Sequence, residues 1–219
     1  MEAAMRLHER FPGGRAVTFP RLTTDDTLRT FQPRTDSLRI LMVNAPIREW
    51  SYPNIAPLGH QYIGAVAMMD GHDVRILDLN AERGGPIEED ERFWRWVDRR
   101  VEWALDYHSP DAIGLGGIVT QYGAIRRMAR LIRMLRPQAK IMLGGGIASC
   151  LPKFMAERLP VDAVIQEEGE VTVSEVLARW EAGVNLEGVL GVAHSLPGGQ
   201  ICDHGHRPSV KAGTEGLDH

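Results

Sequence analysis

Cysteine is scarce in this sequence. Of its 219 residues, two are cysteines, Cys150 and Cys202, and they stand far apart along the chain. Two thiolates cannot by themselves hold an iron–sulfur cluster or a four-thiolate zinc site. We therefore expect free thiols in a reducing compartment.

Long apolar runs and an excess of basic charge are also missing. No stretch approaches the roughly 20 apolar residues of a membrane-spanning helix, and the first 20 residues lack the apolar core of a signal peptide. The sequence has 25 Lys and Arg residues and 29 Asp and Glu residues, which gives a net charge of −4. No basic field is available for nucleic acid. We expect a cytoplasmic protein that has neither a membrane nor nucleic acid as a partner.

Several catalytic signatures do not occur either. The sequence has no Gly-x-x-x-x-Gly-Lys-Ser/Thr phosphate loop, no Gly-x-Ser-x-Gly elbow, and no dinucleotide fingerprint after its first expected strand. Its eight histidines include no His-x-x-x-His pair. His204 and His206 stand in a polar tail, where we expect solvated side chains rather than metal ligands.

What the sequence does contain is a regular alternation of apolar strands and amphipathic helices. Five strand patterns each precede a helical pattern, which predicts parallel strands joined by right-handed crossovers. We expect an α/β fold, a flavodoxin-like doubly wound five-stranded parallel sheet with helices on both faces, plus a small C-terminal β-hairpin. The expected strands are 38–43, 74–79, 112–119, 140–143 and 163–165, and the expected helices are 58–69, 89–107, 125–135, 151–159 and 170–180.

This alternation occupies the middle of the chain. Residues 1–37 carry scattered Pro, Gly and Thr and read as an irregular leader, to which we assign no chemistry. Residues 38–183 form the expected domain. Residues 184–219 are expected to be a hairpin outside the main repeat, followed by a polar linker.

Ligands of open parallel sheets bind beyond the carboxyl ends of the strands, so residues at the strand ends are the candidates. Adjacent glycines at two of these ends would let the backbone approach a ligand without a Cβ. The glycines are equally typical of tight strand-to-helix turns. The glutamates among the candidates are equally typical of a helix N-terminus, where negative charge is favourable. The candidates are Asn44, Ala45, Pro46, Asp78, Leu79, Asn80, Gly116, Gly117, Ile118, Val119, Thr120, Gly144, Gly145, Gly146, Glu168, Gly169 and Glu170.

Taken in order, these segments resemble a known family. Asp70-Gly71-His72-Asp73-Val74-Arg75-Ile76-Leu77-Asp78 looks like its "GHeVrilD" stretch, and the likeness extends from about residue 38 to 180. The family is the cobalamin-binding domain of cobalamin-dependent radical S-adenosylmethionine (SAM) proteins, and residues 189–202 look like its connector to the catalytic barrel. The other matching segments are residues 44–46, 57–59, 110–115, 131–137, 140–145, 161–165 and 168–170.

The resemblance implies a corrin ring on the carboxyl edge of the sheet, with its nucleotide tail running down beside the strand ends. Residues 144–146 would line the tail, residues 116–120 would stand where such domains often carry Ser-x-Leu, and residues 78–80 would face the lower side of the corrin. Residues 168–170 would hydrogen-bond corrin amides or the ribose.

Two departures from the family patterns matter. In the Asp-x-His-x-x-Gly pattern of one large class, Asn80 takes the place of the His that ligates cobalt, and Arg83 takes the place of the Gly. The resemblance then implies base-off, His-off cobalamin. Second, the Cys-x-x-x-Cys-x-x-Cys motif for [4Fe-4S] is absent, so S-adenosylmethionine and the cluster would belong to a catalytic domain in cis or in trans.

We therefore expect a module that presents cobalamin, as a methyl donor, to a radical SAM domain, most simply as one domain of a longer enzyme and with no catalytic residues of its own. One alternative is a stand-alone carrier or sensor without catalysis. Another is a flavodoxin-like domain that binds a flavin or a nucleotide, since fold alone does not settle the ligand.

Overall fold

The computed structural model of the chain describes residues 34, 37–47 and 56–208. The chain divides into two compact units, Met1–Gln32 and Pro33–His219. The strands and helices belong to the second unit. Most of the expected leader, the loop residues 48–55 and the end of the expected linker, 209–219, lie outside the described residues.

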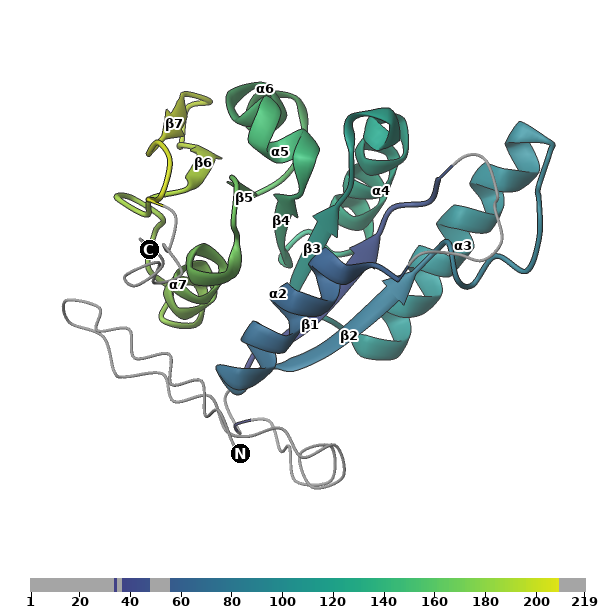
Figure 1. Cartoon of the computed structure of the whole chain (residues 1–219), viewed down its shortest axis with the longest axis horizontal. Helices are drawn as coiled ribbons and strands as arrows, with labels where there is room; N and C mark the ends of the chain where they lie inside the picture. The colour runs from purple at the N-terminus through teal and green to yellow at the C-terminus, as the bar shows by residue number, and fades with distance from the viewer. Residues whose placement is uncertain (1–33, 35–36, 48–55, 209–219) are drawn as a thin grey trace, which may run out of the picture. The chain divides into compact units, whose positions relative to one another are not determined.

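The alternation of strands and helices predicted from the sequence is present, as Figure 1 shows. Strand bounds agree with the prediction to within a few residues. The elements are β1 (Arg39–Asn44), α2 (Leu58–Met69), β2 (Asp73–Asp78), α3 (Asp90–His108), β3 (Ala112–Gly116), the 3-10 turn η1 (Val119–Gln121), α4 (Tyr122–Leu135), β4 (Lys140–Gly144), α5 (Gly146–Cys150), α6 (Pro152–Arg158), β5 (Ala163–Ile165), α7 (Glu170–Glu181), β6 (Val192–Ser195) and β7 (Ile201–Asp203).

The helix expected over 151–159 is present as α6. The structure adds a short helix before it, α5, which the sequence did not predict and which is separated from α6 at Leu151. Pro152 favours a new helix start at this point, because proline has no backbone N–H for a helical hydrogen bond and is favoured at the first position of a helix.

Within the described residues, the strands form a seven-stranded sheet in the order β2-β1-β3-β4-β5-β6-β7. The first five strands are parallel in the flavodoxin-like order 2-1-3-4-5, as expected. The hairpin expected outside the main repeat is antiparallel to these strands and extends the same sheet. β6 pairs antiparallel with β5, and Val192 and Ala193 are fully buried, so the hairpin covers an edge that would otherwise be open.

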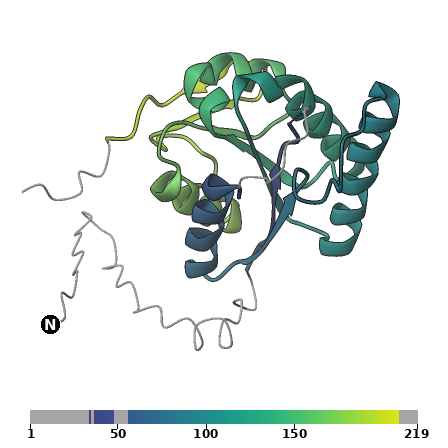
Figure 2. The ribbon, with the colours of Figure 1, turned by 45° about the vertical axis from the view of Figure 1, so that its right-hand side comes forward.

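Helices cover both faces of the sheet. Figure 2 shows α2 and α7 side by side on one face, with α3 and α4 on the other. Two clusters of buried apolar residues, one on each side, fill the space between the helices and the sheet. None of the helices in the described part of the chain is long and apolar enough to cross a bilayer.

The register brings the predicted strand ends together in one row. Asn44 of β1 is paired with Asp78 of β2 on one side and with Gly116 of β3 on the other, and Gly116 is paired with Gly144 of β4. Because paired residues of parallel strands point to the same face, this row lies along the carboxyl edge on one side of the sheet.

Candidate functional site

A cleft of about 330 Å³ lies against the face of the sheet that α2 and α7 cover. It includes the carboxyl ends of β3 and β4 and the loop between β5 and α7. The lining residues are Met42, Gly59, His60, Tyr62, Ile63, Gly114, Leu115, Gly116, Gly117, Met142, Gly144, Gly145, Ile165, Glu167, Glu168, Gly169, Glu170 and Val173.

The floor of the cleft is apolar and lies one row below the strand ends. Met42, Gly114 and Met142 are paired across β1, β3 and β4. A Cβ at Gly114 would lie 2.5 Å from Sδ of Met42, so the glycine makes room for the methionine side chain. Methionine adapts its shape readily, which suits a floor beneath a flat organic group.

Glycine backbone forms the rim. Gly145 has a φ of +84°, and a Cβ there would lie 2.8 Å from the carbonyl oxygen of Gly117, so a side chain is excluded twice over. At Gly144 a Cβ would meet no atom within 4 Å. The missing side chain at Gly144 therefore leaves open space at the mouth of the cleft, whereas Gly145 holds the turn.

His60 forms a wall of the cleft. Its Nε2 donates a hydrogen bond to the carbonyl oxygen of Val43 at 3.1 Å. The same Nε2 lies 2.8 Å from where a Cβ on Gly116 would stand, so this glycine allows the imidazole to approach the sheet. Burial lowers the pKa of His60, and the ring is neutral near pH 7.

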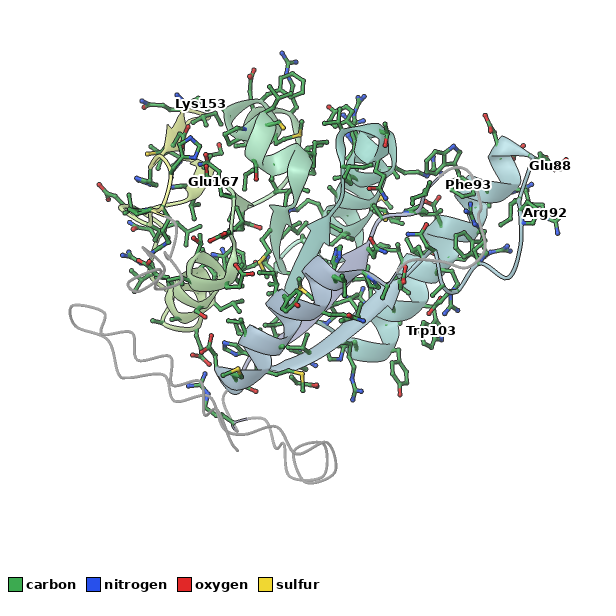
Figure 3. All side chains as sticks on the ribbon, viewed as in Figure 1. Glu88, Arg92, Phe93, Trp103, Lys153 and Glu167 are labelled. Atoms are coloured by element: carbon green, nitrogen blue, oxygen red, sulfur yellow. The ribbon has the colours of Figure 1, made fainter. Side chains whose placement is uncertain are left out.

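Acidic residues border the opposite side. Glu167, Glu168 and Glu170 line the cleft from the β5–α7 loop. Glu167 has a φ of 55° and its backbone N–H donates to Oγ of Ser149 at 2.7 Å. Its carboxylate lies 2.9 Å from Nδ1 of His206, and Figure 3 shows it on the side of the molecule that carries the hairpin. This loop offers acceptors for hydroxyl or amide donors of a ligand.

The predicted residues after β1 and β2 build a polar network beside the cleft. Oδ1 of Asn80 accepts from the N–H of Ile47 at 2.7 Å, and Nδ2 of Asn80 donates to the carbonyl oxygen of Ala45 at 3.1 Å. Nδ2 of Asn44 donates to Oδ1 of Asp78 at 2.9 Å. Asn80 therefore positions the backbone that follows β1.

The predicted residues thus divide into two groups. Ala45 and Leu79 are fully buried in the core, so only their backbone is available to a ligand. Those that line the cleft are Gly116, Gly117, Gly144, Gly145, Glu168, Gly169 and Glu170. Those that lie beside it at the carboxyl edge are Asn44, Ala45, Pro46, Asp78, Leu79, Asn80, Ile118, Val119, Thr120 and Gly146.

Sequence reasoning missed the residues that face the cleft from within elements. Strands buried on both faces are apolar throughout, and nothing in such a run marks which residues face a ligand. His60 had a usable signal, because it is one of two polar residues, with Gln61, near the start of a largely apolar helix. The missed residues within elements are Met42, Gly59, His60, Tyr62, Ile63, Gly114, Leu115, Met142, Ile165 and Val173, and Glu167 joins them from the β5–α7 loop.

Known proteins resemble a large part of the chain. Cytidylyl-2-hydroxyethylphosphonate methyltransferase of Streptomyces wedmorensis is 30% identical over 143 residues, which cover 63% of this chain and 27% of that protein. An uncharacterized methyltransferase of Pyrococcus horikoshii is 23% identical over 156 residues, 71% of this chain and 31% of the relative. The chain spans about three tenths of the length of these curated relatives.

Solved structures share the fold. The radical S-adenosylmethionine methyltransferase TsrM of Kitasatospora setae, with cobalamin and a [4Fe-4S] cluster bound, has a TM-score of 0.62 at 20% identity, over 78% of this chain and 29% of that one. The cobalamin-dependent S-adenosylmethionine radical enzyme OxsB, with aqua-cobalamin and S-adenosylmethionine bound, has a TM-score of 0.64 at 18% identity, over 79% and 23%. The flavodoxin-like architecture expected from the sequence is confirmed.

The family itself is identified by a direct match. The family described as "B12 binding domain" matches residues 49–177, more than half of the chain, including α2, β3, β4 and the β5–α7 loop that border the cleft. The family resemblance inferred from the sequence is confirmed, and the chain belongs to the B12 binding domain family.

Proposed function

We propose that the chain binds cobalamin at the carboxyl edge of its sheet, with the nucleotide tail in the cleft beside α2 and α7 and the corrin ring above the strand ends. The observation that carries the proposal is the glycine rim, where the open space beside Gly144 leads to an apolar floor. A tail inserted there would meet bare backbone first and the Met42 and Met142 side chains below it.

The residues present fit such a group. The cleft of about 330 Å³ is of the size of small-molecule sites, roughly 300–1,000 Å³. Its apolar floor suits the flat base at the end of the tail. The carboxylates of Glu168 and Glu170 offer acceptors at the opposite border, where hydroxyl groups of a ribose would find partners.

We further propose that no imidazole of the chain ligates cobalt. Asn80 stands at the position of the ligating histidine, and its amide is engaged by the backbone of Ala45 and Ile47. An amide is in any case a poor ligand compared with a neutral imidazole. In the wall of the cleft, the Nε2–H of His60 donates a hydrogen bond to the carbonyl oxygen of Val43. The bound cofactor would then be base-off and His-off.

When bound, cobalamin supplies a cobalt centre able to carry a methyl group, and the chain holds and orients it. The tail in the cleft would set the tilt of the ring, and the ring would exclude water from the strand ends. The recipient would be a radical SAM catalytic domain, in cis or in trans, and S-adenosylmethionine and [4Fe-4S] would belong to that domain. The exposed apolar residues Ile47, Leu58, Tyr62, Ile118 and Val119 follow the strand ends or begin α2, and contact with the corrin or with that domain would cover them.

The test is a titration of the purified chain with hydroxocobalamin and methylcobalamin, followed by the visible spectrum and by electron paramagnetic resonance of the reduced Co(II) form. We expect binding with a base-off spectrum and no nitrogen hyperfine splitting. Nitrogen splitting would overturn the His-off assignment. No binding at tens of micromolar, about −6 kcal/mol, would overturn the proposal, and binding of a flavin instead would identify the alternative ligand.

A further inference from the structure

The β6–β7 hairpin gathers three potential metal ligands on one face. His194 of β6 is paired directly with Cys202 of β7, and His204 follows two residues later along the chain. Side chains two residues apart on a strand point to the same face, and those of directly paired residues lie side by side. The three side chains therefore meet although His194 and Cys202 are separated by the hairpin turn. His204, expected to be solvated, is half-buried and lies against His194, whereas His206 is exposed.

Two of the three distances between the ligand atoms match those of a tetrahedral metal site. Nε2 of His194 lies 3.2 Å from Nε2 of His204, and Sγ of Cys202 lies 3.5 Å from Nε2 of His204. All three ligand atoms lie within 4.8 Å of one another. Zn–N bonds of about 2.0–2.1 Å and Zn–S bonds of about 2.3 Å at tetrahedral angles would separate two nitrogens by about 3.3 Å and nitrogen from sulfur by about 3.5 Å.

We propose that His194, Cys202 and His204 form a metal site that takes Zn²⁺, with the fourth position left to water or to an external ligand. Two imidazoles and one thiolate are the donors that this borderline-soft ion prefers. On binding, the thiol of Cys202 loses its proton to solvent and a metal–sulfur bond forms, with no change of oxidation state. Among the residues that the structure describes, these three form the one group of at least three His, Cys, Asp or Glu side chains whose ligand atoms are close enough to share a metal ion.

The surroundings separate this site from the cleft. Asp203 points to the other face of β7, where its carboxylate accepts from Nε2 of Gln166 at 3.0 Å and lies 3.8 Å from Nζ of Lys153. His206 is paired with Glu167 rather than with the cluster. Figure 3 shows Lys153 and Glu167 on this side of the molecule. A bound ion would join β6 to β7 at the edge strand of the sheet.

The site can be tested without cobalamin, so the inference stands or falls independently of the proposed function. The chain is stripped of metal with a chelator and titrated with Co²⁺ as the spectroscopic probe and with Zn²⁺ by calorimetry. We expect one equivalent to bind, a thiolate-to-Co²⁺ charge-transfer band with tetrahedral d–d bands, and protection of one of the two thiols from a thiol reagent by Zn²⁺.

The matched variants use the chain's second cysteine and its neighbouring histidine. Cys202→Ser and His204→Ala should weaken Zn²⁺ binding by more than about a hundredfold, since loss of an outer-shell partner alone costs about 10–100-fold. Cys150→Ser and His206→Ala should leave binding unchanged, because Cys150 lies on α5 and His206 pairs with Glu167. Folding of every variant is checked by circular dichroism.

Two results would overturn the proposal. The first is no Co²⁺ spectrum and no Zn²⁺ binding at micromolar concentration by the folded wild-type chain. The cluster would then be an ordinary hydrogen bond between two imidazoles beside a thiol. The second is Zn²⁺ binding that Cys202→Ser and His204→Ala leave unchanged, which would place the ion elsewhere.

Discussion

Nε2 of His60 donates to the carbonyl oxygen of Val43 across 3.1 Å, which ties the first turn of α2 to β1 at the wall of the cleft. The bond requires one ring tautomer, with the proton on Nε2. Burial is the main cause that lowers the pKa of this imidazole, and the hydrogen bond opposes the shift only in part. The wall of the cleft is therefore an uncharged group at neutral pH.

Three histidines that are buried or half-buried predict how the free energy of unfolding depends on pH. Burial lowers the pKa of His60, His72 and His108 below the ordinary value of 6.5. As pH falls below 6.5, the unfolded chain takes up protons that the folded chain does not, so the free energy of unfolding must decrease. Urea unfolding in the presence of a chelator, from about pH 8 to about pH 5.5, should show this loss.

His60→Gln provides the control for the pH prediction. Its amide can still donate to the carbonyl of Val43 but does not titrate, so the variant should lose less stability on acidification than the wild type. Equal slopes in the two proteins would mean that folding does not lower the pKa of His60.

Closing the mouth of the cleft should prevent cobalamin binding. A side chain at Gly144 meets no atom within 4 Å, so Gly144→Leu should fold and fill the open space. Gly145 is unsuitable, because its φ of +84° and its contact with Gly117 strain any replacement. We expect at least a tenfold weaker affinity, about 1.4 kcal/mol, measured by the spectral titration. Ala65→Leu on the exposed side of α2 is the control, and equal affinities of the two variants would contradict the placement of the tail.

Asn80 is expected to be a structural residue at the carboxyl edge. Asn80→Ala leaves the N–H of Ile47 and the carbonyl of Ala45 without this partner, and the expected cost is about 1–3 kcal/mol. The measurement is the urea midpoint at an unchanged m-value. Asn80→Asp keeps the acceptor for Ile47 and should lose less. A midpoint for Asn80→Ala equal to that of the wild type would show that the loop needs no such support.

Removing the hairpin should damage the whole domain. A chain that ends after Gly183 loses the fully buried Val189 and Val192, each about 1.5–3 kcal/mol, and uncovers the edge of β5. We expect a lower unfolding midpoint and aggregation in gel filtration. A chain that ends after Pro208 retains the sheet and should behave as the full chain does. A monomeric and equally stable 183-residue chain would mean that the hairpin is an appendage.

The sequence predicted the residues at the strand ends but not those of the cleft floor. The turns after β1, β2, β3 and β4 are marked by Asn, Asp and Gly in otherwise apolar runs, and the register then set Asp78, Asn44, Gly116 and Gly144 side by side. The Met42 row below lies in strands that are apolar on both faces, so no alternation marks its orientation.

The hairpin shows the same limit. Its two strands and the turn glycines are readable, since Gly198 and Gly199 both adopt positive φ. The sequence does not predict that the hairpin pairs with β5, because antiparallel addition depends on which edge of the sheet remains open after the other elements have packed. The His194, Cys202 and His204 cluster follows from that pairing, and no spacing rule for metal motifs would have found it.

The sequence by itself determined the order of the elements, the parallel sheet and the family, since local apolar periodicity and turn residues depend on near neighbours along the chain. Tertiary structure decided what lies opposite what: His60 against Gly116, the cleft beside α2 and α7, and the hairpin ligands on one face. The physical reason is that strand register and helix packing bring together residues that are distant in sequence. Such contacts do not change the apolar periodicity of either segment, so neither segment alone predicts them.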